Sequence, residues 1–290
     1  MEIKSFARPT RKNASFRTFY KSLPDILVAS DLKKLVDAIV KAKRTNKMIL
    51  FMLGAHVIKC GLSPLIIDLM KRKAVKAIAL NGAGIIHDTE IAMAGKTSED
   101  VDAALKDGSF GMTEETAAFI NNTISRGVGQ GVGIGKALGI AIAKSKFRHK
   151  DFSILYWGQK LGIPITVHVA IGTDVIHQHP SCNGAAIGEG SLIDFRNFIY
   201  SVSRLNKGVV INFGSAVILP EVFLKAVSTS RNLGYNVKDF VAANFDMYRL
   251  YRPVENVTRR PTSLGGRGLN FTGHHEIMIP FLHQAIVERL

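Results

Sequence analysis

The sequence predicts an α/β protein built on a doubly wound, mostly parallel β-sheet. Two continuous apolar runs, at residues 48–53 and 75–80, have the length and composition of buried strands. The segment between them carries apolar residues on one helical face, and a turn of small residues follows each strand. This strand–helix–strand order is the unit of a parallel sheet, in which ligands bind beyond the carboxyl ends of the strands.

The other elements follow from local signals taken in chain order. A helix at 30–44 has an apolar stripe, Ser63 is expected to cap the next helix with Pro64 at its first position, and Thr113 is expected to cap another. The remaining helices are expected at residues 85–94, from 97, at 113–124, 135–144, 151–161, 191–203, 220–231 and 275–290. The remaining strands are expected at residues 164–170, 209–213 and 240–243, and residues 247–272 are expected to be irregular.

Composition limits the class of protein. No apolar run reaches the roughly 18 residues of a membrane span, and two cysteines, Cys60 and Cys182, make no disulfide framework. We therefore expect a cytoplasmic protein, with Cys60 a buried and inert thiol rather than a reactive one. The net charge of +15 favours anionic partners such as nucleotides or nucleic acid.

Two segments, residues 1–30 and 126–139, have compositions that are also found in phosphate-binding segments. Residues 1–30 form a basic arm that we expect to pack aromatic side chains on a single domain at 31–290, with phosphate binding as the alternative. The run from Arg126 to Gly139 is rich in glycine but does not match a phosphate-binding loop. Gln130 stands where that pattern needs glycine, and Ala137 stands where it needs serine or threonine.

Several segments resemble deoxyhypusine synthase, in the same order along the chain. They are NGAGIIHD (81–88), SILYWGQKLGIPI (153–165), GVVINFGSAVILPEV (208–222), AANFD (242–246), RPVENV (252–257) and EIMIPFLHQAIV (276–287). The resemblance covers residues 40–290 and implies a Rossmann-like domain that assembles as a homotetramer. Members of that family are transferases that bind NAD at subunit interfaces and move an aminobutyl group from spermidine through a lysine imine.

The resemblance also assigns the cofactor positions. The residues that match the family's NAD pocket are Asn81, Gly82, Ala83, Gly84, Gly214 and Asn244, and His87 takes the place of an acidic residue in that pocket. Glycine there lets the backbone approach a pyrophosphate closely. We therefore expect NAD or a related nucleotide at the strand ends.

The departures from the family indicate altered chemistry. Pro261 falls where the imine-forming lysine is expected, and Arg259 falls where a tryptophan is expected. Arginine cannot replace that lysine, because it stays protonated and does not form imines. Glu255 keeps its place and is our first candidate for a catalytic residue.

Charge around that segment predicts an anionic substrate. Arginines outnumber carboxylates there; they are Arg249, Arg252, Arg259, Arg260 and Arg267, against Asp246 and Glu255. Such a cluster attracts phosphate or carboxylate rather than a polyamine. We assign Arg252 and Arg259 to substrate binding.

Histidines in two separate segments are the other candidates for a ligand-binding site. Asp174, His177 and His179 share one loop, and His274 and His275 begin the last helix. If they converge, they form either a metal site or an anion site. We expect the anion site and no metal, with Asp174 and His177 as catalytic residues and His179, His274 and His275 as substrate ligands.

These observations lead to three hypotheses. The first is an NAD-dependent, transferase-type enzyme that acts on a small anionic substrate and does not make deoxyhypusine. The second is a metal-assisted enzyme on the same scaffold. The third is a non-catalytic nucleotide- or nucleic-acid-binding protein, which we do not favour because RNA-binding aromatic motifs are absent from the sequence.

Overall fold

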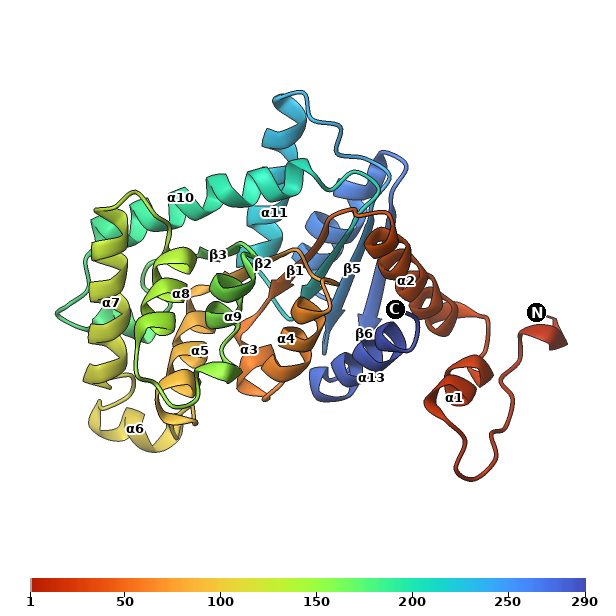
Figure 1. Ribbon diagram of the computed structural model, residues 1–290, viewed down its shortest axis with the longest axis horizontal. Helices are drawn as coiled ribbons and strands as arrows, with labels where there is room; N and C mark the ends of the chain where they lie inside the picture. The colour runs from red at the N-terminus through yellow and green to blue at the C-terminus, as the bar shows by residue number, and fades with distance from the viewer. Residues whose placement is uncertain (1) are drawn as a thin grey trace.

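The computed structural model describes residues 2–290, and its centre is a six-stranded parallel sheet in the order β3-β2-β1-β4-β5-β6 (Figure 1). The strands are β1 (Ile49–Leu53), β2 (Ala77–Asn81), β3 (Ile165–His168), β4 (Val209–Phe213), β5 (Val241–Asp246) and β6 (Arg267–Thr272). The chain first builds β1, β2 and β3 outward to one side, and then β4, β5 and β6 outward to the other. The predicted doubly wound α/β fold is therefore confirmed, with the switch of direction between β1 and β4.

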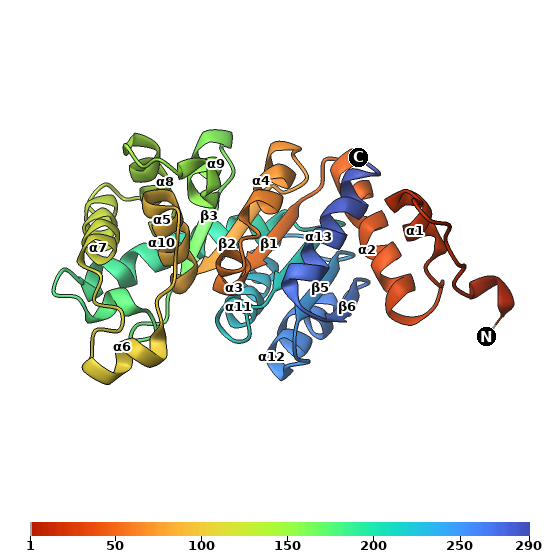
Figure 2. The same cartoon turned by 90° about the horizontal axis from the view of Figure 1, so that it is seen from below.

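Helices cover both faces of the sheet (Figure 2). One face packs on α2 (Leu27–Arg44), α4 (Ser63–Lys71), α5 (Gly82–Ala94), α8 (Ile134–Lys144), α9 (Ile154–Leu161) and α13 (His275–Val287). The other face packs on the C-terminal half of α10 (Gly184–Ser203), on α11 (Ile218–Asn232) and on η4 (Val254–Arg259). Alternation along β1 explains the division, because Phe51 belongs to the first core and Leu50 and Met52 to the second. Within residues 2–290, no helix has both the length and the apolar character that crossing a membrane requires.

The remaining helices lie at the ends and edges of the sheet. They are η1 (Ile3–Ser5), α1 (Phe16–Ser22), α3 (Ala55–Lys59), α6 (Val101–Asp107), α7 (Glu114–Val128), η2 (Lys150–Phe152), η3 (Val175–Gln178), α12 (Tyr251–Pro253) and η5 (Pro261–Ser263). Of these, α6 and α7 lie beside α5 at the β3 end of the molecule, and α1 lies beside α13 at the β6 end (Figures 1 and 2).

The N-terminal segment is attached through aromatic side chains. Phe16, Phe19 and Tyr20 of α1 surround Phe281 of α13, with ring centroids 5.3 to 6.1 Å from that ring. Phe6 has no such aromatic contact among the described residues, and it is exposed, as is part of Phe19. Helix α2 begins at Leu27, before the expected domain start at residue 31.

Some element boundaries differ from the sequence prediction. Residues 247–272 are not irregular, because they form α12, η4, η5 and the edge strand β6. Helix α10 begins at Gly184, seven residues earlier than expected, and the side chain of Asn183 caps it. Ser63 is the first residue of α4 and makes no capping bond. Helix α5 starts directly after β2, and the side chain of Asn81 accepts a hydrogen bond from the backbone N–H of Gly84.

Candidate functional site

The carboxyl ends of β1 and β4 approach each other closely at the switch point. Gly54 follows β1 and Gly214 follows β4, and a Cβ atom added to Gly54 would lie 2.5 Å from the carbonyl oxygen of Gly214. Gly214 has a φ of 67°, and a Cβ atom there would lie 2.3 Å from Nε2 of the buried His275. Both positions therefore need glycine, and His275 fills the space beside Gly214.

A carboxylate stands at the start of α5. A Cβ atom on Gly82 would lie 1.8 Å from Oδ2 of Asp174, and the backbone N–H of Ala83 lies near enough to the carboxylate to act on its pKa. Asp174 is buried, and its Oδ2 atom has no hydrogen-bond partner among the described residues. Nε2 of His177, which also lacks a hydrogen-bond partner there, lies 3.9 Å from that oxygen, so the structure brings these two predicted residues together. Burial raises the pKa of Asp174 to about 6, although the N–H of Ala83 acts in the opposite direction. The side chain thus occupies the place at a helix N-terminus where a phosphate would otherwise bind.

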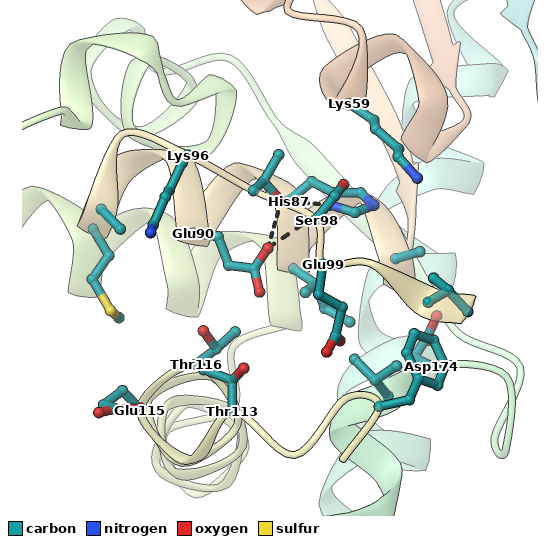
Figure 3. Close-up of a pocket in the computed structure, with 18 of the residues that line it drawn as sticks. Lys59, His87, Glu90, Lys96, Ser98, Glu99, Thr113, Glu115, Thr116 and Asp174 are labelled. Atoms are coloured by element: carbon teal, nitrogen blue, oxygen red, sulfur yellow. Dashed lines mark hydrogen bonds and ion pairs between the residues drawn. The ribbon is translucent and has the colours of Figure 1, made fainter. Parts of the chain in front are cut away.

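A cavity of about 640 Å³ opens beside this carboxylate, between α5, α6 and α7 (Figure 3). That volume lies within the usual range for small-molecule sites. The polar and charged residues that line it are Lys59, His87, Glu90, Lys96, Thr97, Ser98, Glu99, Thr113, Glu115, Thr116, Thr173 and Asp174. Alanine, isoleucine, methionine, valine and phenylalanine side chains complete the walls.

Three side chains form a hydrogen-bonded chain along one wall of the cavity. The hydroxyl of Thr97 donates to Oε2 of Glu90, and its oxygen lies 2.7 Å from Nδ1 of His87 (Figure 3). Burial lowers the pKa of His87, Glu90 raises it, and the charges of Lys59 and His56 lower it again. The net lowering leaves the imidazole neutral near pH 7, so it can accept a proton at one ring nitrogen.

The cavity is richer in acidic than in basic groups. Its lining contains Glu90, Glu99, Glu115 and Asp174 against Lys59 and Lys96. The carboxylate of Glu99 accepts a hydrogen bond from the backbone N–H of Gly111, whereas Oδ2 of Asp174 accepts none. In a protein with a net charge of +15, this local excess of carboxylates favours a cationic or amine-bearing ligand.

The predicted arginine site lies elsewhere and is internally paired. Arg259 and Arg260 both pair with Glu255 on η4, and Arg252 pairs with Glu221 of α11 at 3.3 Å. The hydrogen bond and charge of Arg259 lower the pKa of Glu255, so it remains a carboxylate held between two guanidinium groups. None of these residues lines the cavity. The arginine excess that suggested an anionic substrate therefore does not describe the cavity. Pro261, which stands at the position of the family's imine-forming lysine, is buried.

The four predicted histidines do not form one cluster in residues 2–290. Nδ1 of His177 accepts hydrogen bonds from the backbone of its own loop, and His179 contacts Ser181. His274 lies 3.6 Å from Glu276, and His275 lies beside His56. The first pair follows β3 and the second follows β6, which are the two outer strands of the sheet. The structure therefore does not bring the four together as one site, and anion binding by any of them stays a prediction.

The remaining predicted cofactor residues have partners of their own. Asn244 accepts a hydrogen bond from the side chain of Asn212 at 2.8 Å, and Gly214 is covered by His275. Of the predicted set, Ala83, His87 and Asp174 line the cavity. Lys59, Glu90, Lys96 and Thr97 were missed. The glycine at 95 that ends α5, followed by a polar run, is the signal that could have indicated a pocket-lining loop there.

No protein-family model matches the chain, and no curated protein matches it. Solved structures do share its fold. An LOR/SDH protein from Methanococcus maripaludis S2 matches with a TM-score of 0.53 at 15% identity, over 96% of this chain and 71% of that one. A protein assigned as a deoxyhypusine synthase from Entamoeba histolytica matches with a TM-score of 0.57 at 12% identity, over 97% of this chain and 96% of that one.

A third solved structure is longer than this chain. AgrE, in a ternary complex with ornithine and NAD+, matches with a TM-score of 0.58 at 16% identity, over 89% of this chain. This chain spans only about a third of the AgrE chain, with 33% of it covered. At such identities the likeness concerns the fold, so the resemblance to deoxyhypusine synthase is supported at that level.

Proposed function

We propose that this protein is an enzyme that binds a small amine-bearing substrate in the cavity between α5, α6 and α7. The observation that carries the proposal is the carboxylate of Asp174, which is buried at the cavity wall with one oxygen, Oδ2, that accepts no hydrogen bond and has Nε2 of His177 3.9 Å away. A substrate ammonium group would donate to that oxygen and remove the cost of burying an unpaired charge. The resemblance to an amine-transferring family is consistent with such a substrate, although the imine lysine is replaced by Pro261.

The hydrogen-bonded wall supplies a group for proton transfer. His87 is neutral near pH 7, and Thr97 links it to Glu90, which fixes the imidazole and stabilises its protonated form. A base for a substrate amine needs a pKa near the working pH and a position at the cavity wall. His87 meets the second condition, and its lowered pKa leaves it neutral near pH 7, as a base must be. We therefore assign His87 to proton transfer and Asp174 to binding of the amine.

NAD is the cofactor that the resemblance implies, and AgrE was crystallised with ornithine and NAD+. The start of α5 does not fit a pyrophosphate while Asp174 stands there, because two anions would compete for the same N–H groups. Binding at this helix would need the Asp174 loop to withdraw. No step of the proposed chemistry passes through NAD.

Calorimetry with the purified full chain tests the assignment. Ornithine, putrescine and spermidine are compared with phosphate, succinate and NAD. At least one amine should bind, and Asp174→Asn should weaken that binding about tenfold or more, because it removes the charge while keeping the shape. Glu114→Gln is the matched control, since Glu114 is exposed on α7 beside the cavity residue Glu115 but does not line the cavity. Binding of phosphate or succinate without any amine would reject the proposal in favour of the anionic substrate.

A further inference from the structure

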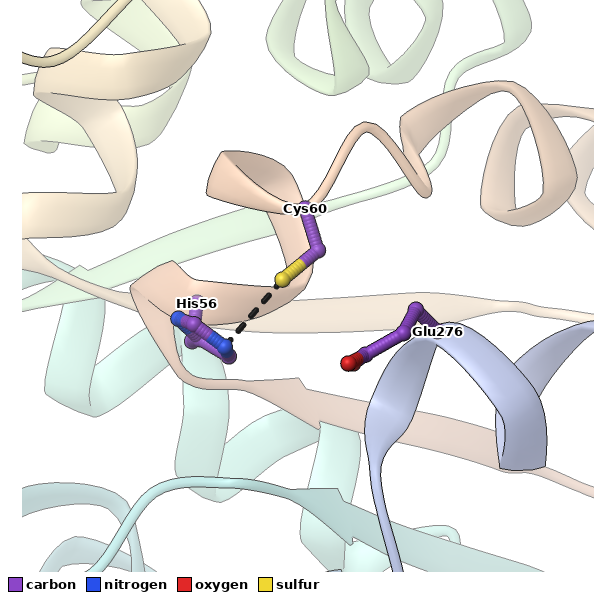
Figure 4. A group of neighbouring side chains, drawn as sticks. All are labelled: His56, Cys60 and Glu276. Carbon is purple, nitrogen blue, oxygen red and sulfur yellow. Dashed lines mark hydrogen bonds between the residues drawn. The ribbon is translucent and has the colours of Figure 1, made fainter.

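A second group of chemically active side chains lies at the switch point, outside the cavity (Figure 4). His56 belongs to α3, Cys60 follows that helix, and Glu276 lies in the first turn of α13. Sγ of Cys60 lies 3.1 Å from Nε2 of His56, and one donor atom from each of the three residues lies within 4.8 Å of the others. In Figure 4 the three side chains point toward one another from two separate helices.

Two separate features of the structure bring these three side chains together. His56 and Cys60 are four residues apart, which places them on the same side of a helical turn. Glu276 comes from the far end of the chain, and its position follows from the packing of α13 on α2 and α4 beside β5. His275, the residue before it, is buried against Gly214 and fixes the start of α13 at the switch point.

The cluster is poorly arranged for a nucleophilic cysteine. Burial raises the pKa of the Cys60 thiol, and the charge of Glu276 raises it further, while Lys59 acts the other way. A reactive cysteine needs surroundings that favour the thiolate. The carboxylate of Glu276 instead faces the thiol and the imidazole. Its Oε1 atom also lies 3.6 Å from Nδ1 of His274.

We propose that His56, Cys60 and Glu276 together bind a divalent metal ion of the zinc class. One sulfur, one imidazole nitrogen and one carboxylate oxygen make a borderline donor set that suits Zn²⁺, whereas Mg²⁺ and Ca²⁺ require oxygen ligands. A thiolate and a carboxylate balance the two positive charges of the ion. Binding displaces the proton of Cys60 and relieves the repulsion between its sulfur and Glu276.

Three protein ligands leave a coordination position for water or another ligand. His56 and Glu276 are exposed, so that position is open to the crevice at the switch point.

Metal titration of the full chain tests the proposal. After treatment with a chelator, the protein is titrated with Zn²⁺ in competition with a chromophoric chelator, and with Co²⁺ to detect absorption from a thiolate–cobalt bond. We expect one Zn²⁺ per chain and a thiolate–cobalt band. His56→Gln and Glu276→Gln should each weaken Zn²⁺ binding about a hundredfold or more, and both residues are exposed, so these changes leave the core intact.

The two cysteines provide the matched control. Cys60→Ser should abolish the cobalt band, whereas Cys182→Ser should retain both the band and the Zn²⁺ affinity. Wild-type protein that binds Zn²⁺ no more tightly than Cys60→Ser would overturn the assignment. A cobalt band that survives Cys60→Ser would also overturn it. These readouts do not depend on amine binding, so they can succeed or fail independently of the proposed function.

Discussion

The arginine-rich segment of α12 and η4 differs from the cavity beside α5 in how its charges are paired. Arg252, Arg259 and Arg260 each pair with Glu221 or Glu255, so three of the five arginines in the segment that is most basic in sequence are engaged in ion pairs. In the cavity the carboxylate of Asp174 has an unpaired oxygen. Charge that is already paired contributes little to ligand recognition, and unpaired buried charge contributes much. Ligand class is therefore indicated by the unpaired groups rather than by local composition.

Gly82→Val is expected to have the largest effect of the changes considered, on both amine binding and stability. Its side chain would overlap Oδ2 of Asp174 and push the carboxylate away from the start of α5. We expect a loss of about 1–3 kcal/mol in the free energy of unfolding and loss of amine binding. Urea denaturation and calorimetry measure the two effects. Gly184→Ala is the control, because no atom lies within 4 Å of a Cβ there; equal behaviour of the two variants would contradict the assigned role of Asp174.

Lowering the pH is expected to have the second-largest effect, because it should weaken amine binding by protonating Asp174. The pKa of Asp174 is raised to about 6, so the carboxylate is charged above pH 6 and protonates below it. Because the ammonium group needs the charged form, affinity should be constant between pH 7 and 8 and fall about tenfold per pH unit below the pKa. Calorimetry from pH 4.5 to 8 gives the profile. Affinity that rises as the pH falls would point instead to an anionic ligand.

The smallest effect is expected from Glu255→Gln. This change leaves Arg259 and Arg260 without their carboxylate partner on an accessible surface. We expect little change in the melting temperature, because exposed ion pairs contribute little, but a measurable gain in sulfate or phosphate binding. Amine binding in the cavity should stay as in the wild type. A loss of amine binding would place Glu255 in the site after all.

Much of the fold could be predicted because buried parallel strands are continuous apolar runs. The run at 48–53 became β1, at Ile49–Leu53, and the run at 209–213 became β4 with the same ends. The edge strand β6, with the sequence RGLNFT, was missed because its outer positions are polar and exposed. The early turns of α10 were missed because glycines at 184, 188 and 190 hide the helical pattern.

The candidate site was less predictable, because its geometry depends on strand order. His177 and His275 both follow strands, and the sequence does not show that β3 and β6 end up at opposite edges of the sheet. Nor does it show that Glu221, 31 residues before Arg252, is the partner of that arginine. The position of Asp174 over Gly82 is likewise a contact between distant segments.

The aromatic contact between α1 and α13 links the two ends of the chain to the switch point. Phe281 lies between Phe16, Phe19 and Tyr20, one turn and a half along α13 from Glu276. Pro280 removes one backbone N–H from this part of α13, but the helix continues from His275 to Val287, so a displacement at Phe281 can reach its first turn through the backbone. Proteolytic trimming of α1, or a partner protein that captured its phenylalanines, would therefore alter the spacing between Glu276 and Cys60. Helix α1 is therefore a place far from the switch point at which the geometry of the proposed metal site could be altered.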